Sequence, residues 1–117
     1  MKYTDRKQIM QTLLRTVHHI YDKEYQKRAW IRGEEADFDE SVCIFFDIVD
    51  DVLNNYRTFQ ITDHQYQTLK KFSEKFKVFS EENNWPPEFI DTPEWNEITE
   101  MAKEVLKAFN YDKIRTH

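Results

Sequence analysis

The chain has 117 residues, of which 39% are hydrophobic and 15% aromatic, and this is enough for one domain with a single core. Charged residues make up 33%, while one glycine and three prolines leave little material for a turn-rich β fold or a glycine-rich phosphate loop. The net charge of −5 argues against direct binding of nucleic acid, and no apolar run approaches the roughly 20 residues of a membrane span.

The first residues, MKYTDRKQIMQ, lack the apolar segment of a secretory signal, so we expect a cytoplasmic protein without membrane contact. Helical periodicity starts directly here. Thr4 is a suitable N-cap for a first helix to about Tyr21, because apolar residues recur three and four positions apart. Asp22 then suits the cap of a short helix over about 23–31, which the only glycine, Gly33, ends.

A third helix is predicted over about 40–56, with Asp39 as its cap and Phe38 packing forward onto its first turns. Around this helix, one side collects the apolar residues Val42, Phe45, Phe46, Val49, Val52, Leu53 and Tyr56. The acidic residues Glu40, Asp47, Asp50 and Asp51 fall on the opposite side.

Thr62 and Gln65 have the spacing of a capping box and open a fourth helix to about Glu82. The sequence NNWPP then stops the helix, and Thr92 before a proline is a strong start signal for a fifth helix to about Phe109. No strand-like alternation lasts long enough to predict a strand. We therefore expect an all-α, single-domain bundle of about five helices, four long and one short, with residues 110–117 as a flexible tail.

Charge is distributed unevenly along the chain. Residues 1–32 contain eight basic and three acidic residues, whereas residues 33–56 contain eight acidic and no basic ones. Residues 81–100 repeat the pattern with seven acidic residues and no basic one. Two acidic blocks suit contact with something basic, although a solvated helix face that keeps the protein in solution explains each block equally well.

Like charges lie close together on the predicted third helix. Asp47 and Asp51 are four residues apart and Asp50 is three from Asp47, so these pairs repel by a few tenths of a kcal/mol each. No basic residue within the helix relieves that repulsion, which favours a cation from outside. Glu97 and Glu100 oppose the apolar stripe of the fifth helix in the same way.

Catalytic and metal chemistry fits the pattern less well. The pairs Asp47-x-x-Asp50 and Glu97-x-x-Glu100 have the spacing of a magnesium site in a helical bundle, but such a site needs carboxylates that point inward. The four histidines lack zinc-site spacing, and the lone Cys43 is expected as a packed thiol at the edge of the core. We expect no catalytic residue, no metal and no cofactor.

Four short motifs carry a family resemblance: EYQKRAW at 24–30, DFDESV at 37–42, FFDIVDD at 45–51 and TPEWNEITEMA at 92–102. Their order and spacing are similar to a family of small all-helical bacterial proteins that includes immunity proteins of contact-dependent growth inhibition systems. The resemblance covers about Arg6 to Phe109, and its motifs are mostly packing positions. It implies a non-enzymatic role: binding the toxic C-terminal domain of a cell-surface effector, here an RNA-cleaving nuclease, for example of the EndoU type.

A nuclease must attract a polyanion and therefore exposes basic residues, which an acidic inhibitor can cover. The candidate partner-binding residues are Glu34, Glu35, Asp37, Glu40, Asp47, Asp50 and Asp51, with Glu97 and Glu100 as a second patch. Two alternatives stay open: a magnesium-dependent nucleotide hydrolase of the helical-bundle type, and a helical interaction domain with an unrelated partner.

Overall fold

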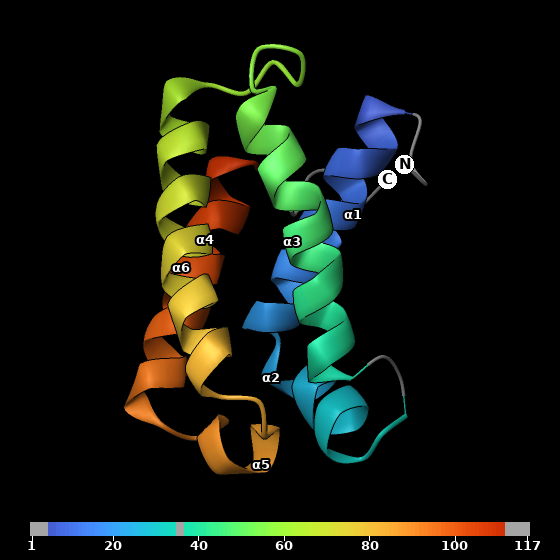
Figure 1. Cartoon of the computed structure of the whole chain (residues 1–117), viewed down its shortest axis with the longest axis vertical. Helices are drawn as coiled ribbons and strands as arrows, with labels where there is room; N and C mark the ends of the chain where they lie inside the picture. The colour runs from blue at the N-terminus through green and yellow to red at the C-terminus, as the bar shows by residue number, and fades with distance from the viewer. Residues whose placement is uncertain (1–4, 35–36, 112–117) are drawn as a thin grey trace.

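A computed structural model describes residues 5–34 and 37–111, and four long helices dominate it (Figure 1). They are α1 (Arg6–Tyr21), α3 (Phe38–Asn54), α4 (Asp63–Glu82) and α6 (Pro93–Ala108). Helix α1 packs against both α3 and α6, and α4 packs against α6 and approaches α3, so the four helices surround one core. The described residues contain no strand, which confirms the predicted all-α bundle.

Three short elements close one end of the bundle. Helix α2 (Lys23–Gln26) continues without a break into a π-helical turn, η1 (Lys27–Ile31), and Gly33 with a φ of +71° ends this segment as predicted. Helix α5 (Pro86–Phe89) was not predicted, because the two prolines indicated a stop. Proline is nevertheless well suited to the first turn of a helix, and one turn forms there before the chain reverses into α6.

The helix starts confirm most of the predicted caps and correct two of them. Asp22, Thr62 with Gln65, and Thr92 each cap the helix that follows, and Thr62 and Gln65 form the reciprocal capping box. The first helix, however, is capped by Asp5, whose carboxylate accepts a hydrogen bond from the backbone N–H of Lys7. The predicted cap, Thr4, lies outside the described residues, and the assignment was one position early.

The start and the end of α3 also differ from the prediction. Asp37 is the N-cap in place of Asp39, because its carboxylate accepts a hydrogen bond of 2.8 Å from the backbone N–H of Glu40. Phe38 therefore lies inside the first turn and is buried. The helix ends at Asn54, where Asn55 donates from its side chain to the carbonyl of Asp51. The predicted end, Tyr56, lies in the following turn.

An aromatic cluster fills the closed end of the core, with Trp95 of α6 at its centre. Trp95 has no exposed surface, and five rings have their centroids within 6.4 Å of its own: those of Trp30, Phe38, Phe76, Phe79 and Phe89. These rings come from η1, α3, α4 and α5, so the side chain of Trp95 joins four elements at this end. Ring pairs in tilted or edge-on contact stabilise a core beyond the area they bury.

Gln26 links the end of α1 to this cluster through hydrogen bonds made by both polar atoms of its side chain. Its amide nitrogen donates to the carbonyls of His19 and Ile20 at 3.0 and 2.7 Å, and its oxygen accepts from the indole N–H of Trp95 at 3.0 Å. The side chain is fully buried. It therefore satisfies two carbonyls at the end of α1 that have no partner within the helix, and it fixes the orientation of Trp95.

The end of the described chain returns to the first helix. Tyr111 is buried, and its ring lies 5.5 Å from that of His18 on α1. The predicted tail began at residue 110, so its first two positions belong to the folded part, and 112–117 lie outside the described residues. In the part of the chain that is described, no helix has the length and apolarity needed to cross a membrane.

Candidate functional site

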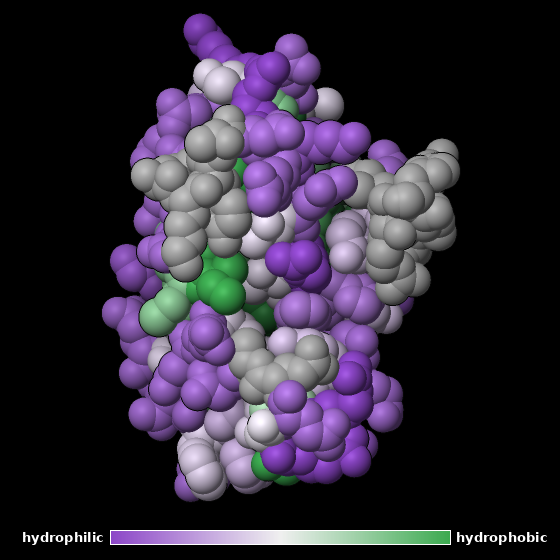
Figure 2. All heavy atoms as spheres, turned by 90° about the vertical axis from the view of Figure 1, so that its right-hand side faces the viewer, coloured by the Kyte–Doolittle hydropathy of each residue, from purple (hydrophilic) through white to green (hydrophobic). Residues whose placement is uncertain are grey.

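The acidic residues of α3 lie on its outer surface, but not on a single face. Glu40 and Asp47 are exposed and point away from the core residues Phe45 and Val49. Figure 2 shows the side of the molecule on which α1 and α3 lie, and hydrophilic residues cover most of it around a small apolar patch. Glu40, Asp47 and Asp50 are exposed, which confirms for these three the prediction that they face outward, away from the bundle interior.

Asp50 and Asp51 lie on opposite flanks of that surface. Asp50 lines a groove of about 560 Å³ between α3 and α4, whose other wall includes Lys70 and Lys77. Asp51 is half-buried, and its carboxylate accepts a hydrogen bond of 3.2 Å from the side chain of Asn55. The predicted acidic face is therefore divided: Glu40 and Asp47 lie on the outside of α3, and Asp50 and Asp51 lie to either side of them.

These four carboxylates have no ion pair within residues 5–34 and 37–111. The ion pairs found there join Lys23 to Asp91, Arg32 to Glu34, Lys75 to Glu97 and Lys107 to Glu104. The last turn of α3 also contains no basic residue, so Asp50 and Asp51 lie near the negative end of the helix dipole without compensation. Glu40, Asp47, Asp50 and Asp51 together are called the α3 acidic surface below.

The other predicted residues have more local roles. The carboxylate of Glu34 lies 3.3 Å from the guanidinium of Arg32, so a neighbouring charge partly neutralises it. Glu35 lies outside the described residues. On α6, Glu100 is exposed, whereas Glu97 forms a 3.3 Å ion pair with Lys75 of α4. The second predicted patch is therefore partly balanced by the protein's own lysine.

Asp37 is predicted to stabilise the fold as well as to carry charge. Replacing it by Ala should lower the free energy of unfolding by about 1 kcal/mol, because the N–H of Glu40 loses its acceptor. Asp37→Ser keeps a capping oxygen and should retain most of the stability. Urea denaturation of both variants checks this expectation, and equal losses in the two would contradict the capping role.

Within the described ranges, no group of three or more His, Cys, Asp or Glu side chains is arranged to hold a metal ion. Cys43 is exposed on α3, so its predicted place at the edge of the core is wrong. Cys43 lies outside the apolar side of α3, between Glu40 and Asp47.

His19 has a strongly lowered pKa. Its ring stacks on that of Tyr25 with centroids 3.7 Å apart, and burial, followed by the positive charges of His18 and Arg15, lowers its pKa to about 4. The imidazole is therefore neutral near pH 7. His19 lies on α1 and stacks on Tyr25 of α2, so it contributes to the packing of these two helices.

This pKa makes the stability dependent on pH. The unfolded chain binds a proton at His19 near pH 6.5 and the folded protein only near pH 4, so stability contributed by the neutral ring is lost as the pH falls between these values. His19→Phe keeps an aromatic ring on Tyr25 and removes the titration. Denaturation at pH 7.5, 5.5 and 4.5 should show a steeper loss for the natural protein than for the variant. Parallel losses would show that His19 does not contribute.

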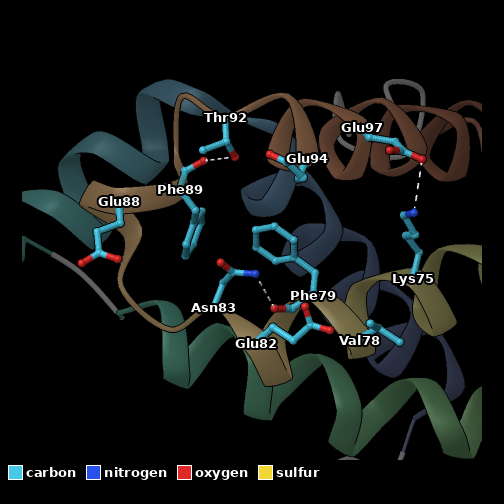
Figure 3. Close-up of a pocket in the computed structure, with 10 residues that line it drawn as sticks. All are labelled: Lys75, Val78, Phe79, Glu82, Asn83, Glu88, Phe89, Thr92, Glu94 and Glu97. Atoms are coloured by element: carbon cyan, nitrogen blue, oxygen red, sulfur yellow. Dashed lines mark hydrogen bonds and ion pairs between the residues drawn. The ribbon is translucent and has the colours of Figure 1, made fainter.

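A cavity of about 440 Å³ opens between the end of α4, α5 and the start of α6 (Figure 3). The rings of Phe79 and Phe89 form its inner wall, with centroids 5.1 Å apart and planes nearly perpendicular. Glu94 lies on the α6 side and Glu82 on the α4 side. The remaining lining residues are Lys75, Val78, Asn83, Glu88, Thr92 and Glu97.

No protein-family model, no curated protein and no solved structure matches this chain.

The sequence pattern missed the residues of this cavity. The acidic block at 81–100 was recognised, but only Glu97 and Glu100 were selected from it, because they oppose the apolar stripe of one helix. Glu82, Glu88 and Glu94 belong to three different elements and meet only when the chain reverses through α5. Among the aromatic residues, Tyr56 and Trp85 are 40% and 59% exposed, whereas Phe89 is buried.

Proposed function

We propose that the protein is an immunity protein, which binds the toxic C-terminal domain of a bacterial cell-surface effector and blocks it. The toxin is proposed to be an RNA-cleaving nuclease. The family resemblance of the four motifs supports the biological role, and the α3 acidic surface supports the chemistry of the contact. The inhibitor itself has no turnover in this proposal.

The observation that carries the proposal is the absence of compensating charge on α3. Glu40 and Asp47 are exposed, and no lysine or arginine of the described residues pairs with them or with Asp50 and Asp51. Repulsion between such neighbours slightly destabilises the free helix. A positively charged partner removes this repulsion, and its relief makes the free energy of binding more favourable.

The same arrangement suits the inhibition of a nuclease. The cleft of an RNA-cleaving enzyme carries lysine, arginine or histidine residues that attract phosphates. Carboxylates on a rigid helix increase the rate of encounter with such a cleft and occupy the positions of the phosphates. The half-buried Val42, Phe46 and Leu53 in the groove beside Asp50 add apolar surface next to the charge.

The test is an interaction assay with the C-terminal domain of a large secreted protein, which the proposal expects to be encoded immediately upstream. Co-expression should protect cells from that domain, and the purified proteins should form a complex in a one-to-one ratio. The affinity should fall with rising salt, because the contact is between opposite charges. A neighbouring toxin domain that kills cells equally with and without this protein would refute the proposal.

A further inference from the structure

The cavity between α4, α5 and α6 is the strongest candidate for a second binding site. Its carboxylates outnumber its ammonium groups: Glu82, Glu88, Glu94 and Glu97 line it together with Lys75 alone. All of these charged side chains are exposed, while Phe79 and Phe89 behind them are buried. The exposed carboxylates form the rim of the cavity and the buried rings lie beneath them, so the cavity suits a cationic group on an apolar stem.

We infer that this cavity receives an arginine side chain from a basic segment of a protein partner. The inference goes beyond the proposed function, because it concerns a surface built by other helices and stands even if the α3 acidic surface binds nothing. Arginine fits better than lysine because its planar guanidinium carries five N–H donors in a fixed geometry and can donate to two carboxylates at once.

The protein's own Lys75 already places one cation at the edge of the cavity. Its ammonium group reaches from α4 across to α6 and lies 3.3 Å from the carboxylate of Glu97 (Figure 3). A long cationic side chain is thus accommodated at one edge of the cavity. Glu82, Glu88 and Glu94 have no ion pair within residues 5–34 and 37–111, so most of the negative charge stays available for a second cation.

Apolar surface at the same end indicates a protein segment as the source of the arginine. Val78, on the rim, is 56% exposed, and Trp85, in the connection from α4 to α5, is 59% exposed. Tryptophan and arginine are the residues that most often dominate the energy of protein interfaces. A small polyamine would use the carboxylates but would leave this apolar surface uncovered.

The test is an NMR titration of the ¹⁵N-labelled protein with the peptide acetyl-Ala-Leu-Arg-Leu-Ala-amide. Saturable shifts should centre on residues 78–97, and the same peptide with citrulline in place of arginine should give none, because citrulline lacks the charge. Glu82→Gln and Glu94→Gln together should weaken binding at least fivefold. Glu104→Gln, which removes an exposed charge of α6 outside the cavity lining, should leave the affinity unchanged.

A second variant tests the site through a gain of affinity. Lys75→Met removes the internal cation and releases Glu97, so the arginine peptide should bind several-fold more tightly. Lys71→Met makes the same change in net charge on α4 outside the cavity and should have no such effect. Equal effects of the two lysine variants, shifts spread over α3, or spermidine shifts as strong as those of the peptide would each overturn the inference.

Discussion

Replacing Trp95 by Ala is expected to lower the free energy of unfolding by about 3–5 kcal/mol, a large part of the stability of a domain of this size. The substitution removes a fully buried ring that contacts five other rings from four elements. It also leaves the side-chain oxygen of Gln26 without its indole donor in a buried position. Urea denaturation, followed by far-ultraviolet circular dichroism, measures the loss.

Trp85 supplies the matched control for this experiment. It is 59% exposed, so Trp85→Ala should change the free energy of unfolding by no more than about 0.5 kcal/mol. Gln26→Leu separates the two contributions at Trp95, because it keeps the ring contacts and removes only the hydrogen bonds. A loss at Trp95 no larger than that at Trp85 would contradict the central place of Trp95 in the core.

Reversing the charge of Asp47 and Asp51 to Lys is expected to weaken binding of the toxin domain by about 100-fold, or about 2.7 kcal/mol. Both carboxylates belong to the α3 acidic surface, and the new ammonium groups would repel a basic cleft. The association rate should fall most strongly at low salt, since long-range attraction is lost. Binding kinetics at two salt concentrations, together with the protection of cells, provide the measurement.

Two comparisons make this result specific. Glu24→Lys with Glu104→Lys changes the net charge equally at exposed positions away from α3, and should affect binding only slightly. The α3 variant itself should be about as stable as the natural protein, because basic charge near the C-terminal end of α3 suits the helix dipole and offsets the lost hydrogen bond from Asn55 to Asp51. Unchanged affinity in a stably folded α3 variant would remove the acidic surface from the proposed function.

Local sequence signals predicted most of the secondary structure. The capping box of Thr62 and Gln65 and the Thr92–Pro93 start lie where they were expected, since each signal depends on atoms a few residues apart. The start of α3 was misplaced because Asp37, Asp39 and Glu40 form a run of acidic residues. Asp37 is the cap because Phe38 is buried in the first turn of α3. Which residues are buried depends on the packing of the whole core.

Contacts between distant residues could not be predicted in this way. Gln26 and Trp95 are 69 positions apart, and nothing in either local sequence marks them as partners. The pairing of Lys75 with Glu97 depends similarly on how α4 and α6 are placed. Helical periodicity correctly placed Asp47 and Glu100 on the outside, but it describes one helix at a time and so missed the cavity that three elements share.

The position of Cys43 gives the α3 acidic surface a built-in attachment point. It is the only cysteine in the chain and it is exposed. It lies three residues after Glu40 and four before Asp47, about one turn from each. A maleimide dye therefore reacts at one known place without any engineered residue. Its fluorescence reports arrival of a partner at this helix, whereas a bulky polyethylene glycol attached there keeps the partner away.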